Sequence, residues 1–352
     1  MRWKLALVFL VTVACLLWVL WGMKLEDLSL SLKHFQPLWI LPALLLLTSN
    51  MFVRNLRFRL LLETEQPLPF FSLLSIVTVG FLAINVIPLR MGELVRPYLL
   101  HESHDVPFGT SLAAVVLERL LDFLGMLTLL LLIGAFVQLP SAGLVVQGID
   151  IFSLGLRLSA FFVAAGLVGI VLFSWMGERS VQWMAGLFAR ISPALSGVIS
   201  SLGLKFVHGL RALFARPSRA LWALVCTFLI WSSTLLMVAC MMWGFKGMTP
   251  TFSSVIFNWG ATMVGIVFLP TPGFFGGFEA GNVASLLLFK VPLALARTYA
   301  LVLHLVVFFH AVAAGLFFLM MEGWSLVSLV KNSQQTLESE SSEKLPASSE
   351  SQ

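Results

Sequence analysis

The sequence predicts an all-α protein with about six full transmembrane helices and two re-entrant helical hairpins of opposite orientation. Of its 352 residues, 59% are hydrophobic and only 11% are charged. Soluble domains are closer to half apolar and a quarter charged, so the chain has too few charges to cover a soluble surface. Apolar runs of about 20 residues also recur from end to end, and each is long enough to cross a bilayer as a helix.

Six apolar segments are predicted to cross the membrane completely. The first, residues 5–22, follows Arg2 and Lys4 and lacks the small-residue cleavage site of a signal peptide, so we interpret it as a membrane helix. The other five are residues 37–60, 108–138, 154–177, 218–245 and 294–323.

Two regions, residues 70–105 and 251–290, are predicted to enter the membrane and turn back. The first apolar run meets Pro88, and the second breaks at Pro270. After the second break only about 12 apolar residues precede Lys290, which is roughly 18 Å of helix and too short to cross. Irregular backbone at membrane depth survives only where protein or a water-filled cavity covers it.

The basic residues orient these segments. If the N-terminus is cytoplasmic and both regions are hairpins, most of the 22 Lys and Arg residues fall on the inside, as the positive-inside rule requires. We therefore expect a multi-pass protein of the cell (inner) membrane with both termini cytoplasmic. The hairpins would then enter from opposite faces, as in inverted-repeat transporters.

We divide the chain into a transmembrane domain, residues 1–330, and a disordered polar tail, residues 331–352, which is rich in Ser and Glu. Residues 178–217 are basic with interleaved apolar residues, and they form either an interfacial segment or an ordinary cytoplasmic loop. The net charge of +5 is explained by topology signals, so no nucleic-acid partner is expected. The three cysteines lack metal-ligand spacing, and no metal or cofactor is expected.

Ionisable residues inside a membrane segment are costly and usually functional. Within 108–138, Glu118 and Asp122 share a helix face, and Arg119 lies within reach of both. Two interpretations stay open: an ion pair that locks neighbouring helices, or part of a polar site. Counted alone, these three charges leave one carboxylate free to bind a base or a proton.

A second cluster follows the first hairpin break, where Arg90, Glu93 and Arg96 are three residues apart and Gly92 would let another backbone approach. Two arginines with one carboxylate suit a phosphate, because the guanidinium is a planar fork of donors that the carboxylate can orient. The alternative is a set of interfacial arginines that only satisfies the positive-inside rule. Arg54 and Arg57, which share a helix face, either anchor the topology or contact headgroups.

The second hairpin break contains Pro270, Pro272, Gly273, Gly276 and Gly277. A helix that restarts near Gly277 would direct its N-terminus into the membrane, where it could hold an anion. Glu279 falls in the first turn of that helix, and it either belongs to the polar site or caps the helix. His304 and His310 of the last helix do not share a face and are expected to be packed and hydrogen-bonded.

Taken in order, these motifs resemble those of a known family. They are Asn55-x-Arg57, Arg90-x-Gly92-Glu93-x-x-Arg96, Glu118-Arg119-x-x-Asp122, and Pro270-Thr-Pro-Gly273 followed by Gly276 and Glu279. Residues 5–325 resemble the transmembrane domain of lysylphosphatidylglycerol synthases, a flippase-like family. The sequence departs from the family pattern at Phe274-Phe275, where a glycine more often follows Pro-Gly.

In two-domain members of that family, the membrane domain is linked to moving an aminoacylated phospholipid between leaflets, and a soluble aminoacyl-transfer domain follows it. Here a short polar tail follows instead. The resemblance therefore implies a lipid translocase and does not imply lysyl transfer.

The leading hypothesis is a translocase that moves a phospholipid or lipid-linked headgroup through a charged cavity between the hairpins. The residues expected to bind the phosphate are Arg90, Arg96, Arg119 and Arg57. The carboxylates expected to orient them, or to contact a cationic headgroup, are Glu93, Glu118, Asp122 and Glu279. Its partners would be membrane lipids, either an anionic phospholipid or a lipid-linked substrate, with homo-oligomerisation left open.

We assign no catalytic residue and find no ATP-binding motif, so movement would be passive or driven by protons through a carboxylate such as Glu118. Two alternatives are kept. One is a membrane glycosyltransferase that uses a polyprenyl-phosphate donor, for which Glu26 and Asp27 are the only outer-loop carboxylate pair. The other is a non-transporting scaffold whose charges form internal salt bridges.

Overall fold

The computed structural model describes residues 25–64, 68–87, 92–136, 145–146, 149–189, 192–268 and 271–342. These residues are almost entirely helical, which confirms the all-α class. Two short strands, β1 (Val145–Val146) and β2 (Ile149–Asp150), form an antiparallel pair between the sixth and seventh helices. The predicted first crossing, residues 5–22, lies outside the described residues.

The helical elements in chain order are α2 (Leu25–Lys33), η1 (Pro37–Trp39), α3 (Ile40–Leu61), α4 (Phe70–Val86), α5 (Val95–His104), α6 (Phe108–Phe136), α7 (Ile151–Met176), α8 (Glu178–Ala189), α9 (Pro193–Phe214), α10 (Pro217–Trp243), α11 (Phe252–Phe268), η3 (Pro272–Phe274), α12 (Gly277–Leu288), α13 (Leu293–Met321) and α14 (Leu326–Ser342).

Four helical spans within the described part of the chain are long and apolar enough to cross a membrane. They are Pro37–Leu61, Leu156–Met176, Pro217–Trp243 and Leu293–Met321, and each matches a predicted crossing. α6 matches the predicted crossing 108–138 and has 29 residues, but it carries a group of charged side chains in its middle. The chain is therefore a multi-pass helical membrane protein.

Each of the two regions predicted to be hairpins forms a pair of helices separated by a break. α4 and α5 flank residues 87–94, the first break, and α11 and α12 flank residues 269–276, the second break. These helices have 17, 10, 17 and 12 residues. Their lengths are about 15 to 26 Å at 1.5 Å per residue, each below the roughly 30 Å of hydrocarbon that a full crossing requires.

The breaks form where the sequence places glycine and proline. In the second break, Gly273 and Gly276 have φ angles of 62° and 90°, which glycine adopts without the steric penalty of other residues. η3, within this break, packs against α4, so the two broken regions meet inside the protein. Arg90 of the first break and Pro270 of the second lie outside the described residues.

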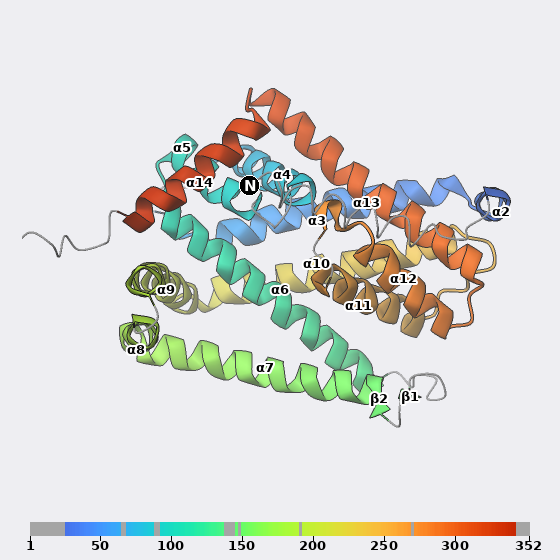
Figure 1. Ribbon diagram of the computed structural model, residues 1–352, viewed down its shortest axis with the longest axis horizontal. Coiled ribbons are helices and arrows are strands. Elements are labelled where there is room, and N and C mark those ends of the chain that lie inside the picture. Colours follow the sequence, from blue (N-terminus) through green and yellow to red (C-terminus); the bar gives the residue numbers. More distant parts are fainter. Residues whose placement is uncertain are drawn as a thin grey trace, which may run out of the picture.

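The long helices α3, α7 and α10 run roughly along the long axis of the molecule, and α6 and α13 run obliquely to it (Figure 1). α8 and α9 are seen end-on near one end of that axis, beside the start of α10, so they cross the direction of the long helices. An interfacial helix lies in the plane of the membrane and would also cross the spanning helices. The placement of residues 178–217 on a membrane surface stays a prediction.

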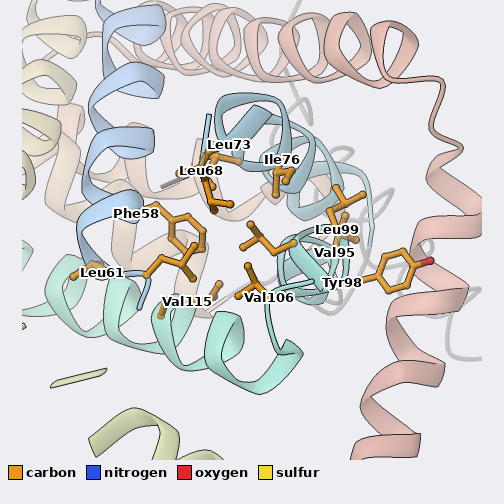
Figure 2. Packing of buried hydrophobic residues seen from close by; sticks show 14 of the residues in the cluster. Phe58, Leu61, Leu68, Leu73, Ile76, Val95, Tyr98, Leu99, Val106 and Val115 are labelled. Atoms are coloured by element: carbon orange, nitrogen blue, oxygen red, sulfur yellow. The ribbon is translucent and has the colours of Figure 1, made fainter. Parts of the chain in front are cut away.

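A cluster of fully buried apolar side chains holds α3, α4, α5 and α6 together (Figure 2). Phe58 of α3, Ile76 of α4 and Leu99 of α5 have at most 1% of their surface exposed. Between membrane helices such packing stabilises the arrangement through van der Waals contacts, because lipid tails are as apolar as the side chains themselves. The cluster fixes the short α5 against α6, and thereby places the charged residues of these two helices beside each other.

The C-terminal segment differs from the prediction of a disordered tail starting at residue 331. Residues 331–342 are helical and belong to α14. Leu329 is buried in the cluster of Figure 2, and Asn332 Nδ2 donates a hydrogen bond to the Tyr98 hydroxyl of α5 at 3.0 Å. An apolar anchor just before the polar stretch therefore docks the helix, which composition alone does not reveal. Residues 343–352 lie outside the described residues.

Candidate functional site

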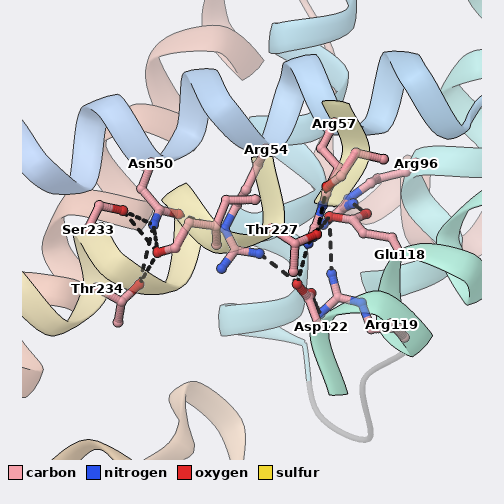
Figure 3. A network of polar contacts seen from close by, with 12 residues as sticks. Asn50, Arg54, Arg57, Arg96, Glu118, Arg119, Asp122, Thr227, Ser233 and Thr234 are labelled. Carbon is pink, nitrogen blue, oxygen red and sulfur yellow. Dashed lines mark hydrogen bonds and ion pairs between the residues drawn. The ribbon is translucent and has the colours of Figure 1, made fainter. Parts of the chain in front are cut away.

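Glu118, in the middle of α6, is fully buried and faces three arginines (Figure 3). Its Oε2 accepts a hydrogen bond from Nη1 of Arg96, in α5, at 2.6 Å. Its Oε1 accepts one from Nη2 of Arg57, in α3, at 3.1 Å, and lies 3.6 Å from Nη2 of Arg119. The carboxylate of Glu118 therefore links α6 to both α3 and α5.

Asp122 lies one turn further along α6, on the same face. Its Oδ1 lies 2.7 Å from Nη1 of Arg57. Its Oδ2 lies 3.5 Å from Nη1 of Arg119 and 3.7 Å from Nη1 of Arg54. Arg57 thus bridges the two carboxylates through its two terminal nitrogens, a use of the guanidinium fork that a lysine could not reproduce.

Neutral groups hold these arginines in place from α3 and α10. Arg57 Nη1 donates to Thr227 Oγ1 at 3.1 Å. Arg54 Nε donates to Asn50 Oδ1 at 2.7 Å, and Asn50 Nδ2 donates to the carbonyl of Ile230 at 2.8 Å. These bonds orient the cationic side chains, because the neighbouring helix fixes the partners that they bind.

Aromatic rings cover the remaining faces of the guanidinium groups. The Arg96 guanidinium lies 4.3 Å from the ring centroid of Phe81, in α4, and that of Arg54 lies 5.0 Å from the same ring. Such contacts stabilise a cation where water is excluded. Close packing is also required here, since a Cβ at Gly80 would overlap Arg96, and one at Gly92 would overlap the Ala83–Ile84 backbone. The close approach predicted at Gly92 is therefore present.

The cluster contains more positive than negative charge. Four arginines (Arg54, Arg57, Arg96 and Arg119) surround Glu118 and Asp122, and Glu93 lies at the same place, so an excess of one positive charge remains. The expectation of a free carboxylate in α6 is therefore wrong, because arginines of α3 and α5 join the group. Within the described structure, Nε and Nη2 of Arg119 are buried without a hydrogen-bond acceptor, as are Nε and Nη2 of Arg96 and Nε of Arg57. Uncompensated buried cations are costly, which favours an anionic ligand at this place.

A cavity of about 390 Å³ adjoins the cluster. Its charged end is formed by Arg54, Glu93, Arg119 and Asp122. The Arg119 side chain is 35% exposed and that of Arg54 13%, whereas those of Arg57 and Arg96 are at most 1% exposed. Arg119 and Arg54 therefore face the cavity, and Arg57 and Arg96 support the carboxylates behind it.

The rest of the cavity wall is mainly apolar. It is formed by side chains of α3, α6, α10, α11 and α13, including Leu47, Phe123, Met126, Met237, Met263, Ile266 and Val307. The tips of both broken regions complete it: Asn85 precedes the first break and Glu93 lies within it, while Phe274 lies within the second break and Phe278 follows it. The cavity is amphipathic, with a cationic end and an apolar body.

Glu279 belongs to a separate buried polar group in the second break. Its Oε2 accepts a hydrogen bond from the Gly276 backbone N–H at 2.7 Å, and its Oε1 lies 2.6 Å from Nδ1 of His304, in α13. His304 Nε2 lies 2.7 Å from the carbonyl oxygen of Gly273. Of the two interpretations left open for Glu279, the contacts support the helix cap: Glu279 caps α12 and binds a histidine, and it contacts no arginine through a hydrogen bond or ion pair in the described structure. Its carboxylate lies at the helix N-terminus that could otherwise hold an external anion.

The remaining glycine of the second break also has a packing role. The carbonyl oxygen of Gly277 lies so close to Gly265 of α11 that a Cβ at Gly265 would overlap it. Gly281 of α12 approaches the Ala261 carbonyl of α11 in the same way. α11 and α12 therefore pack backbone to backbone, and this contact is possible because small residues line it.

The role of Asn50 and the contact between His304 and Glu279 were not predicted from the sequence. Asn50 is polar within an apolar segment, one turn before Arg54, and this spacing was the available signal. His304 was expected to be packed and hydrogen-bonded, which is confirmed, but no local pattern links it to Glu279. Arg54 was interpreted chiefly as a topological anchor, although it faces the cavity.

The chain matches the family described as lysylphosphatidylglycerol synthase TM region over residues 3–315. No curated protein and no solved structure matches it. The family match covers most of the chain, agrees with the resemblance carried by the motifs, and places the protein among membrane proteins of lipid metabolism or transport. The chain therefore belongs to the lysylphosphatidylglycerol synthase transmembrane-region family.

Proposed function

We propose that the protein moves an anionic lipid headgroup between the leaflets of the cell membrane, with the headgroup phosphate bound by Arg119 and Arg54. The observation that carries this proposal is the excess of positive charge in the arginine cluster at one end of an otherwise mainly apolar cavity. Guanidinium groups bind phosphate oxygens through paired, charge-assisted hydrogen bonds. A phosphate would supply the negative charge that the cluster lacks.

The cavity suits a headgroup more than a whole lipid. Its volume of about 390 Å³ lies in the range of small-molecule sites. The apolar wall would contact the glycerol region, while the acyl chains stay in the surrounding bilayer. In this arrangement the acyl chains do not have to pass through the protein, because only the polar headgroup enters the cavity.

In this proposal the two broken regions are re-entrant hairpins that enter from opposite faces, with both termini cytoplasmic. Their tips supply part of the cavity wall, which accounts for irregular backbone at membrane depth. Small movements of the tips would open the cavity toward one leaflet or the other, as expected for transporters with opposed broken helices.

The residue roles follow from exposure. Arg119 and Arg54 contact the headgroup, while Arg57 and Arg96 hold Glu118 and Asp122 as positioning residues. A scaffold built only for stability would be expected to neutralise its own charges. The unbalanced cluster and the adjoining cavity therefore support ligand binding over the scaffold alternative.

The test is a leaflet assay on purified protein in vesicles that contain phosphatidylglycerol labelled on one acyl chain with a fluorophore that dithionite quenches. The wild type should expose lipid from the inner leaflet to quencher faster than protein-free vesicles do. Arg119→Gln should slow this by about tenfold or more, as expected for the loss of a charge-assisted contact. Arg59→Gln, the same substitution at an exposed position of α3, is the control and should leave the rate unchanged. Equal rates for Arg119→Gln and the wild type would overturn the assignment.

A further inference from the structure

We infer that Glu279 and His304 form a proton-binding site that couples lipid movement to the movement of protons. This inference rests on the proposed translocation and assigns its coupling ion. The pair lies in the second break, separate from the arginine cluster, and no ionisable group of that cluster hydrogen-bonds to either residue in the described structure.

The hydrogen-bond geometry requires one proton between the two side chains. The Gly273 carbonyl can only accept, so the 2.7 Å contact requires a proton on His304 Nε2. At 2.6 Å, Nδ1 and Glu279 Oε1 must also share a proton, because two lone pairs would repel each other. The pair is then neutral overall, either as imidazolium with carboxylate or as imidazole with carboxylic acid.

Because the pair is buried, loss of that proton would leave its negative charge away from water. Glu279 is 0% exposed and His304 is 2% exposed. The imidazole stacks on Phe278 with centroids 4.2 Å apart, and Phe275 lies 4.4 Å away. Loss of the proton would leave an uncompensated negative charge in an aromatic enclosure, which is unfavourable unless the tip of the break rearranges.

The neighbouring elements supply few other charges. α4, α11 and η3 contain no ionisable side chain, and Glu279 is the only one in α12. α13 contributes Arg297 and Tyr299 near its start and His310, whose Nε2 bonds Thr48 Oγ1 at 3.0 Å. α2, which packs against α13, contains Glu26, Asp27 and Lys33. α3 and α10 add Arg54, Arg57, Arg59 and Arg219 together with Cys226 and Cys240.

The proton-binding pair also forms part of the wall of the proposed lipid site. His304, Phe274 and Phe278 all line the cavity, and the two bonds of His304 join α13 to the turn at Gly273 and to the start of α12. Breaking the Nδ1–Oε1 bond would release this tip from α13. Because one proton and one monoanionic headgroup together carry no net charge, their joint movement would be electroneutral.

The Glu279→Gln variant tests the role of the proton without removing the hydrogen bonds that hold the turn. Its amide oxygen can still accept from the Gly276 N–H, and its amide N–H can donate to Nδ1 of a neutral His304 that keeps Nε2–H on Gly273. The variant therefore retains the bonds of the turn but holds no exchangeable proton between the partners. Glu178→Gln is the matched control, since Glu178 lies 3.8 Å from His208 in an exposed pair.

The experiment measures the leaflet distribution of labelled phosphatidylglycerol in vesicles with and without a gradient of about one pH unit. One proton per lipid would shift the wild-type distribution by up to about tenfold, since the proton ratio sets the limit. Glu279→Gln should still equilibrate the lipid without a gradient and lose the gradient-driven shift, while Glu178→Gln keeps both. His304→Gln, a second variant, should also lose the shift.

Three results would overturn the inference. A wild type that moves lipid but ignores the gradient would remove proton coupling and leave the proposed function intact. A Glu279→Gln variant with the full wild-type shift would remove this pair as the site. If the wild type moves no labelled lipid beyond protein-free vesicles, the proposed function fails, and the coupling inference fails with it. If both variants lose all activity, the response of the wild type to the gradient still decides whether movement is coupled to protons. Variants that also fail to fold in detergent would show that the pair is structural, whereas folded but inactive variants would support its role in transport.

Discussion

Arg96 and Glu118 form a fully buried ion pair between two helices, with Nη1 and Oε2 2.6 Å apart and neither side chain more than 1% exposed. The pair links the short α5, which follows the first break, to the centre of α6. Truncating one partner of a buried pair leaves the other charge unpaired, which is strongly destabilising.

Arg96→Gln should therefore lower stability by about 3 to 5 kcal/mol. Arg96→Lys should recover only part of the loss, because an ammonium keeps the charge but not the planar fork. Thermal unfolding of the detergent-purified protein, followed by the fluorescence of the 11 tryptophans, measures both. Unfolding of Arg96→Gln at the wild-type temperature would show that the pair does not hold α5.

Gly92 should not tolerate a side chain. A Cβ there would overlap the backbone of Ala83 and Ile84, and backbone cannot move aside as a flexible side chain can. Gly92→Ala is expected to cost about 1 to 3 kcal/mol, as overpacking does. The control is Gly169→Ala in α7, where a Cβ would meet nothing within 4 Å. The prediction is contradicted if both variants express and unfold alike.

The docking of α14 should depend on Leu329, which is 5% exposed. Leu329→Ala is expected to destabilise the helix contact by about 2 to 5 kcal/mol, because it removes buried apolar surface and leaves a cavity. Limited proteolysis of α14 should then accelerate. Val327→Ala, at a position 81% exposed on the same helix, should have no such effect. Equal cleavage rates in the two variants would contradict the docking seen here.

The sequence predicted the parts of the site that local patterns encode. The shared face of Glu118 and Asp122 follows from helix periodicity, and the positions of both breaks follow from proline and glycine. It also predicted close backbone approach at Gly92. These features depend on residues a few positions apart, where the geometry of one helix or one turn decides the outcome.

The remaining features depend on how distant helices pack. Arg57 meets Glu118 across 61 positions, and Glu279 meets His304 across 25. Charge counting within α6 alone could not include arginines that arrive from α3 and α5. The free negative charge counted within α6 alone was therefore wrong, although the charged residues themselves were identified.

The most direct test of the central claim is the charge selectivity of lipid movement. In the leaflet assay, the wild type should move acyl-labelled phosphatidylglycerol faster than acyl-labelled phosphatidylethanolamine, by about tenfold or more, because only the former lacks a cation to offset its phosphate. The double variant Arg54→Gln with Arg119→Gln removes both cationic side chains that face the cavity and should abolish this preference. A wild type that moves both lipids at the same rate, or a double variant that keeps the preference, would contradict the account.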